Sequence, residues 1–122
     1  MTKRADIQCD IAVVGGGLAG GLAALALAKQ RPDLDVRLIE GGVIGGNHVW
    51  SWFDSDIDPE HRWILAPLAA HHWDSYDIAF PAHARTLNTG YNSTSGTALK
   101  AAVQAALPDD RIVPIAAAAL EP

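Results

Sequence analysis

The first forty residues alternate short apolar runs with one alanine- and leucine-rich segment. Cys9–Val14 is rich in isoleucine and valine and ends at a glycine, which predicts a strand buried on both faces. Leu18–Gln30 has leucines at helical spacing and is soon followed by a proline, so it predicts a helix. Val36–Ile39 predicts a second strand that ends in Glu40. Residues 9–40 should therefore form a compact strand–helix–strand unit.

After this unit the pattern loosens. Gly, Asn, Ser, Asp and Pro are frequent from position 41 to 59, which predicts a long loop with one helical turn. Partly helical spacing continues over Pro59–Ala70, while Ser75–Phe80 alternates as a strand does. Long ordered loops are usually functional, so the segment 41–58 is a candidate part of a site.

The last third of the chain predicts one more helix and one more strand. Ser93 or Ser95 can cap a helix that runs from about Gly96 to Leu107. An apolar strand is expected over Arg111–Ile115, and the alanine-rich tail that follows carries no clear signal. The expected fold class is α/β.

Composition narrows the function classes. The chain has 122 residues, 49% hydrophobic and 19% charged, with a formal net charge of −5, so we expect one domain at most and no nucleic-acid binding. Its one cysteine, Cys9, excludes an internal disulfide and suggests core packing. The uncharged run from Ile11 to Ala28 contains five glycines, which makes a poor membrane span, so a cytoplasmic location is expected.

The turn after the first strand matches a nucleotide-binding pattern. Gly15, Gly17 and Gly20 fit G-x-G-x-x-G between a predicted strand and a predicted helix. The first glycine permits a tight turn, the second lets a pyrophosphate approach the backbone, and the third lets the helix pack on the strand. The helix N-terminus then presents free N–H groups to the phosphates.

Glu40 supplies the second half of this pattern. It lies twenty positions after Gly20 at the end of the second strand, where an acid can bind the ribose hydroxyls. An acid here favours FAD or NAD over NADP, because it repels a 2′-phosphate. The alternative is a closely packed strand–helix turn with Glu40 as a solvated strand end, which explains the glycines less well.

The loop from Gly41 to Asp56 reads GGVIGGNHVWSWFDSD and supports a family resemblance. This segment is similar to the N-terminal region of the bacterial lycopene β-cyclases, in which a GGNH-x-W-S segment follows the same glycine motif. Further similarity covers Trp73–Tyr76, Phe80-Pro81, Arg85–Leu87 and Tyr91. The resemblance extends over roughly residues 8–107.

This resemblance implies the N-terminal part of a Rossmann-type, glutathione-reductase-like FAD-binding domain, spanning 1–122 and incomplete. The implied cofactor is reduced FAD, with NAD(P)H as electron source. The candidate cofactor-binding residues from motif and resemblance together are Gly15, Gly17, Gly20, Glu40, Gly45, Gly46, Asn47, His48 and Arg85. Arg85 is a candidate phosphate contact, although a surface salt bridge is nearly as good an explanation.

The implied reaction converts the acyclic ends of lycopene to β-rings without net oxidation. Members of this family have chains several times longer, and the acid that protonates the polyene is expected beyond Pro122. The isolated 122-residue chain is therefore expected to be inactive. Because the substrate is apolar, the resemblance also implies peripheral contact with the inner face of a membrane.

Other interpretations remain open at this point. The module also suits another FAD- or NAD-dependent oxidoreductase, such as a hydroxylase or desaturase, or a non-catalytic nucleotide-binding remnant. Trp50, Trp52 and Phe53 either line an apolar channel or pack beneath the loop, and His48 either contacts flavin or orients the loop.

Two further groups of residues are only weak evidence for a site, one for a metal site and the other for a hydrolytic triad. The sets considered for a metal are Asp54, Asp56 and Asp58, and His61, His71, His72 and Asp74. The aspartates lack the glycine and terminal glutamate of a calcium loop, and adjacent histidines point in different directions, so no metal is expected. Ser51, His48 and Asp54 have the residue types of a hydrolytic triad but lack a nucleophile elbow.

Overall fold

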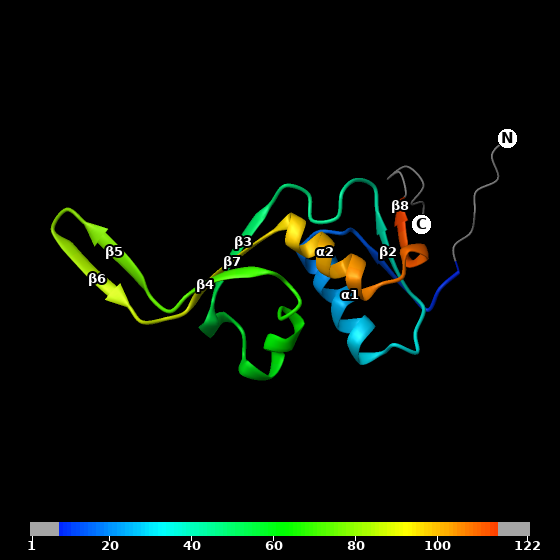
Figure 1. The fold of residues 1–122 in the computed structure, drawn as a ribbon, viewed down its shortest axis with the longest axis horizontal. Coiled ribbons are helices and arrows are strands. Elements are labelled where there is room, and N and C mark those ends of the chain that lie inside the picture. Colours follow the sequence, from blue (N-terminus) through cyan, green and yellow to red (C-terminus); the bar gives the residue numbers. More distant parts are fainter. Residues whose placement is uncertain (1–7, 115–122) are drawn as a thin grey trace.

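The computed structural model describes residues 8–114 and shows an elongated molecule (Figure 1). A parallel sheet with two helices forms one end, a small antiparallel sheet the middle, and a projecting hairpin the other end. In chain order the elements are β1 (Ile11–Val14), α1 (Leu18–Gln30), β2 (Val36–Glu40), β3 (Val49–Phe53), the 3₁₀ turns η1 (Asp54–Asp56) and η2 (Pro59–Ile64), β4 (Ala70–Trp73), β5 (Tyr76–Phe80), β6 (His83–Leu87), β7 (Tyr91–Ser95), α2 (Gly96–Ala106), η3 (Asp109–Arg111) and β8 (Ile112–Pro114).

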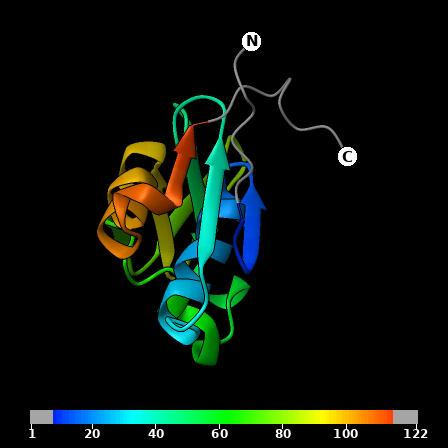
Figure 2. The ribbon, with the colours of Figure 1, turned by 90° about the vertical axis from the view of Figure 1, so that its right-hand side faces the viewer.

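The parallel sheet has the strand order β1-β2-β8, and both helices lie on one face of it (Figure 2). The register pairs Val13 with Leu38, and Leu38 with Ile112. The strand–helix–strand unit predicted over residues 9–40 is confirmed, and its helix has the predicted bounds. The sequence and this sheet together show an α/β fold.

The core lies between α1, α2 and the sheet. Leu38, Leu99 and Val103 are fully buried there. The helices approach closely at Gly21, where an added Cβ would lie 2.8 Å from the Leu99 side chain. Trp50 and Leu68 join the same cluster from the antiparallel part. One continuous core therefore holds the two sheets together.

The prediction of a long loop over residues 41–58 is wrong for Val49–Phe53, which forms strand β3, while the 3₁₀ turn η1 agrees with the one helical turn expected there. β3 pairs antiparallel with β7, which also pairs with β4. Neither β4 nor β7 was expected. Their residues are mostly polar or exposed, and pairing between distant segments decides their conformation rather than local apolar periodicity.

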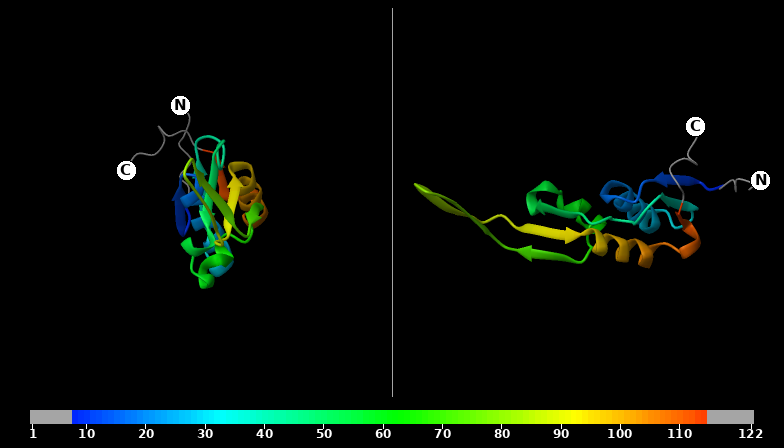
Figure 3. Two further views of the ribbon diagram at one scale, coloured as in Figure 1. Left: turned by 90° about the vertical axis from the view of Figure 1, so that its left-hand side faces the viewer. Right: turned by 90° about the horizontal axis from the view of Figure 1, so that it is seen from above.

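Strands β5 and β6 form an antiparallel hairpin, called the arm below, that projects along the long axis of the molecule (Figures 1 and 3). The strand expected over Ser75–Phe80 is confirmed as β5, whereas β6 was not predicted. The arm pairs with no other strand of residues 8–114.

The C-terminal predictions agree with the structure as far as it describes the chain. The helix predicted from Gly96 is α2, and Ser95 caps it by accepting a hydrogen bond from the N–H of Ala98 at 3.2 Å. The expected strand is β8, while the tail from residue 115 lies outside the described residues. Neither helix in the described part combines the length and the apolar character needed to cross a membrane.

Candidate functional site

The turn between β1 and α1 has the geometry of an anion-binding turn. Gly15 has a φ of 103°, which side chains disfavour, and its N–H donates to the carbonyl of Ile39 at 2.8 Å. α1 then begins at Leu18, with Gly17 as its N-cap and no side-chain hydrogen bond at that cap. At this turn the first N–H groups of the thirteen-residue helix α1 therefore have no side-chain hydrogen-bond partner.

Two glycines of the motif face different surroundings. An added Cβ at Gly20 would lie 1.8 Å from the carbonyl oxygen of Gly15, so only glycine permits the helix to sit this close to the turn. An added Cβ at Gly17 would meet no atom within 4 Å. The space in front of Gly17 is thus open, as the approach of a phosphate requires.

Glu40 lies beside this turn rather than at a distance from it. Its half-buried carboxylate accepts a hydrogen bond from the N–H of Gly16 through Oε2 and another from that of Gly42 through Oε1, at 3.2 Å. Each carboxylate oxygen has two acceptor sites, so capacity remains for hydroxyl donors. The structure therefore brings the acid and the glycine-rich turn together.

The loop after β2 contains Gly45 and Gly46, is called the glycine loop below, and contacts the turn between β1 and α1. The N–H of Gly45 donates to the carbonyl of Gly16 at 2.7 Å, and Gly45 has a φ of 78°. Its backbone also touches α2, since an added Cβ would lie 2.2 Å from the Gly96 carbonyl oxygen. Gly46 follows with a φ of 53°. Turn, loop and helix start therefore form one backbone-lined cradle.

A cavity of about 310 Å³ lies next to Glu40, at the carboxyl ends of β2 and β8. Ligands of open α/β sheets bind at this edge. Its lining residues are Glu40, Gly42, Val43, Ile44, Lys100, Gln104, Asp109, Ile112, Val113 and Pro114. The cavity combines apolar walls with polar groups, which suits the nucleoside end of a dinucleotide.

The predicted site residues divide into two groups. Gly15, Gly17, Gly20, Glu40, Gly45 and Gly46 meet at the cradle. Asn47 and His48 follow directly in the chain and are exposed; the His48 carbonyl accepts a hydrogen bond from the N–H of Gly96 at 2.8 Å.

Arg85 belongs to the second group. It lies on β6 in the arm, at the end of the molecule opposite the parallel sheet (Figure 1). The structure therefore does not bring Arg85 to the cradle residues.

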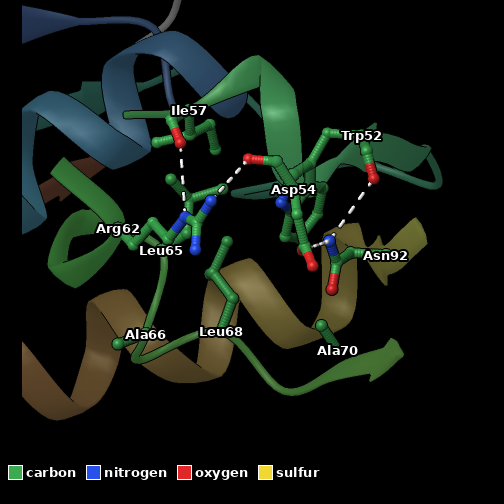
Figure 4. A pocket seen from close by; sticks show the side chains of 9 residues that line it. All are labelled: Trp52, Asp54, Ile57, Arg62, Leu65, Ala66, Leu68, Ala70 and Asn92. Carbon is green, nitrogen blue, oxygen red and sulfur yellow. Dashed lines mark hydrogen bonds between the residues drawn. The ribbon is translucent and has the colours of Figure 1, made fainter. Parts of the chain in front are cut away.

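The three aromatic side chains of β3 have different surroundings. Trp50 packs against the core, as one of the two alternatives predicted. Trp52 instead lines a cavity of about 230 Å³ between β3 and η2 (Figure 4). Phe53 contacts Tyr76 and Tyr91, with ring centroids 5.2 and 5.4 Å away.

A hydrogen-bonded network at this second cavity was missed by the sequence analysis. The buried amide of Asn92 donates to the Asp54 carboxylate at 2.8 Å, and its oxygen lies 2.7 Å from Nδ1 of His72 (Figure 4 shows the contact with Asp54). Since the amide oxygen can only accept, Nδ1 must carry a proton. The only signal in the sequence is Asn92, a polar residue in the middle of β7. Its role becomes apparent only when β3 and β4 pair with β7.

This network raises the pKa of His72. The hydrogen bond with Asn92 raises the pKa of the imidazole most, and the hydrogen bond with Asp74 at 3.1 Å raises it further. Burial opposes both effects. The network ties β4 to β7 and to η1, and Arg62 adds a bond to the Asp54 carbonyl at 2.9 Å (Figure 4).

The structure places the other candidate ligands as follows. His71 and His72 are adjacent in β4, opposite Ser93 and Asn92, and therefore point to different faces. Asp58, Glu60 and His61 bring their ligand atoms within 4.8 Å of one another, all exposed, and no second observation points to a metal there. The Ser51 hydroxyl donates to Ser93 at 3.2 Å.

Comparison with known proteins agrees with the resemblance noted in the sequence. A family model described as lycopene cyclase protein matches residues 10–120. Lycopene beta-cyclase of Pantoea ananas is 49% identical over 84 residues, which cover 67% of this chain and 22% of that protein. The enzyme of Pseudescherichia vulneris is 45% identical over 100 residues, 80% of this chain and 26% of that protein. That of Paracoccus sp. is 46% identical over 96 residues, covering 77% and 25%.

The first prediction concerns the two glycines of the turn. Gly→Ala inside a helix ordinarily stabilises, by about 0.5–1 kcal/mol. We expect Gly20→Ala to destabilise the protein instead, because the new Cβ would overlap the Gly15 carbonyl. Gly17→Ala is the comparison: its new Cβ would meet no atom within 4 Å, so it should cost only the difference between alanine and glycine at an N-cap, about 1 kcal/mol or less. Urea titration of both variants tests this, and a stabilised Gly20→Ala protein would contradict the packing described.

The second prediction concerns His72. Because its pKa is raised in the folded state, its contribution to stability is complete below the unfolded pKa of about 6.5 and is lost as pH rises through the folded value. Asn92→Ala should lower the pKa of His72 more than Asp74→Asn does, as measured by NMR titration of the imidazole. An equal or larger effect of Asp74→Asn would show that the amide is not the main partner.

Proposed function

The chain belongs to the lycopene cyclase family, and on this premise we propose that it forms the dinucleotide-binding N-terminal part of a lycopene β-cyclase. The chain spans about a quarter of the length of the curated relatives it matches. The observation that carries the proposal is the cradle, in which the glycine-rich turn, Glu40 and the glycine loop meet within a family match over residues 10–120.

We propose FAD as the bound dinucleotide. The N–H groups at the start of α1 and the open space at Gly17 would hold the pyrophosphate, with Gly15 and Gly20 setting the backbone. Glu40 would accept the ribose hydroxyls, and its acidity disfavours a 2′-phosphate. Gly45, Gly46, Asn47 and His48 would border the ligand from the glycine loop. Arg85 is left out, because the arm holds it away from the cradle.

The cradle needs little rearrangement to take such a ligand. Glu40 is already held by two backbone N–H groups, so its carboxylate is oriented before binding. The loop is fixed to the turn by the Gly45–Gly16 hydrogen bond. Preorganisation of this kind reduces the entropy that binding would otherwise cost.

The proposed reaction closes the acyclic ends of lycopene into β-rings as an isomerisation. An acid protonates the terminal alkene, the ring closes through a carbocation, and a proton leaves. Bound reduced flavin, kept reduced by NAD(P)H, would supply negative charge that stabilises this cation. No residue among 8–114 is assigned the role of the acid. The protein would act in the cytoplasm, in peripheral contact with the membrane that dissolves its substrate.

A second candidate function is an FAD- or NAD-dependent oxidoreductase, because the turn and Glu40 alone do not select the chemistry. The full-length protein, given lycopene in detergent micelles with reduced flavin and no oxygen, separates the two. The proposal predicts a β-ring product of unchanged mass. A product of net oxidation or reduction, or no cyclised product, would contradict it.

Variants tie this activity to the cradle. Glu40→Ala removes a charged hydrogen-bond partner and should weaken flavin retention by about tenfold or more. Glu60→Ala is the matched control, because Glu60 is an exposed acid on η2 with a side chain 75% exposed. Absorbance of flavin retained after gel filtration measures both. Equal losses in the two variants would remove Glu40 from the site.

A further inference from the structure

The arm carries two different faces. In an antiparallel pair, directly opposite residues share a face. The register therefore places Tyr76 with Leu87, Ile78 with Arg85, and Phe80 with His83 on one face. The opposite face carries Asp77, Ala79, Ala84 and Thr86, where the Thr86 hydroxyl donates to the Asp77 carboxylate at 2.6 Å.

The tip of the arm is apolar and exposed. Phe80 is 66% exposed, and Pro81 and Ala82 beside it are exposed as well. A large aromatic side chain at the end of a projecting hairpin, which pairs with no other strand of residues 8–114, contributes little to the stability of these residues. It is well placed to enter another apolar medium.

The charge of the arm differs from that of the whole chain. The chain carries a net charge of −5, whereas Asp77 and Arg85 offset each other in the arm, and its outer part, residues 78–87, contains Arg85 and His83 and no acid. Arg85 is exposed, and no carboxylate within residues 8–114 forms an ion pair with it. The cation shares its face with Ile78, next to the Phe80 pair. An apolar tip beside a free cation is complementary to an anionic lipid surface.

The apolar face leads back into the body of the protein. Tyr76, at the base of the arm, contacts Phe53 at 5.2 Å and Tyr91 at 6.3 Å between ring centroids. Trp73 joins the same group through Tyr91 at 5.8 Å. Phe80 lies four positions along the strand from Tyr76, a rise of about 14 Å. The β5 side of this face therefore forms an apolar strip, Tyr76, Ile78 and Phe80, between the aromatic cluster and the tip. Arg85 and His83 lie beside it on β6.

We propose that the arm is the element by which this protein contacts an anionic membrane, with Phe80 entering the lipid interface and Arg85 facing the phosphates. The contact is weak and reversible, because one aromatic side chain and one or two cations give only modest affinity. The inference rests on the proposed function, since a substrate dissolved in the bilayer is the reason for such a contact.

Co-flotation of the full-length protein with vesicles tests this. Mixed phosphatidylcholine–phosphatidylglycerol vesicles should bind it more strongly than phosphatidylcholine alone, and salt should reduce the difference. Phe80→Ser should lower partitioning by about tenfold, and Arg85→Gln by about fivefold on anionic vesicles. Phe80→Trp should retain binding, since tryptophan favours the interface. Arg31→Gln makes the same charge change away from the arm and should have no effect.

Two outcomes would overturn the inference. One is unchanged vesicle binding in Phe80→Ser and Arg85→Gln. The other is a lowered thermal unfolding temperature in Phe80→Ser without lowered vesicle binding, which would show that the tip packs against protein. The cyclisation activity of the wild-type protein is measured in parallel in detergent micelles, where no contact with a membrane is needed. Absence of that activity would contradict the proposed function, while vesicle binding would still decide the role of the arm.

Discussion

The contact that the rest of the structure depends on is the close approach of three glycine backbones, Gly16, Gly45 and Gly96. They come from the turn after β1, the loop after β2 and the start of α2. Gly45 donates to the Gly16 carbonyl at 2.7 Å, and a Cβ on either Gly45 or Gly96 would lie 2.2 Å from a carbonyl oxygen of the other. A side chain at Gly45 or Gly96 would therefore force the loop after β2 away from the start of α2.

This contact explains why the candidate site has so few functional side chains. A surface made from backbone N–H groups and a helix N-terminus binds phosphate without needing basic residues, which suits an acidic chain. Glu40 completes it, because the same carboxylate that would bind a ribose is oriented by the N–H groups of Gly16 and Gly42. The cradle therefore packs the turn, the loop and the helix start together, and in the proposed function it also serves as the binding surface.

The sequence predicted the parts whose conformation is decided locally. α1, β2 and α2 follow from apolar periodicity, from proline and from the Ser95 cap. β7 could not be predicted in this way, since its buried residues are Asn92 and Thr94, which break the apolar alternation. Its conformation depends on β3, and Ser51 and Ser93 pair across 42 positions of sequence.

The candidate site shows the same division. Spacing alone identified Gly15, Gly17, Gly20 and Glu40 as neighbours, because a strand–helix–strand unit has one geometry. The Asn92 network needed two long-range pairings that no local pattern indicates. Arg85 illustrates the reverse case: its residue type suits a phosphate, but the hairpin around it carries it away from the cradle.

The most direct measurement of the central claim is the dissociation constant of FAD for the protein and for its Gly17→Val variant. An added Cβ at Gly17 would meet no atom within 4 Å, so the valine should cost about 1 kcal/mol of stability or less at this N-cap while it blocks the pyrophosphate. The account predicts a dissociation constant raised by about a hundredfold or more, a loss of roughly 3 kcal/mol of binding free energy. An unchanged dissociation constant in a folded variant would contradict it.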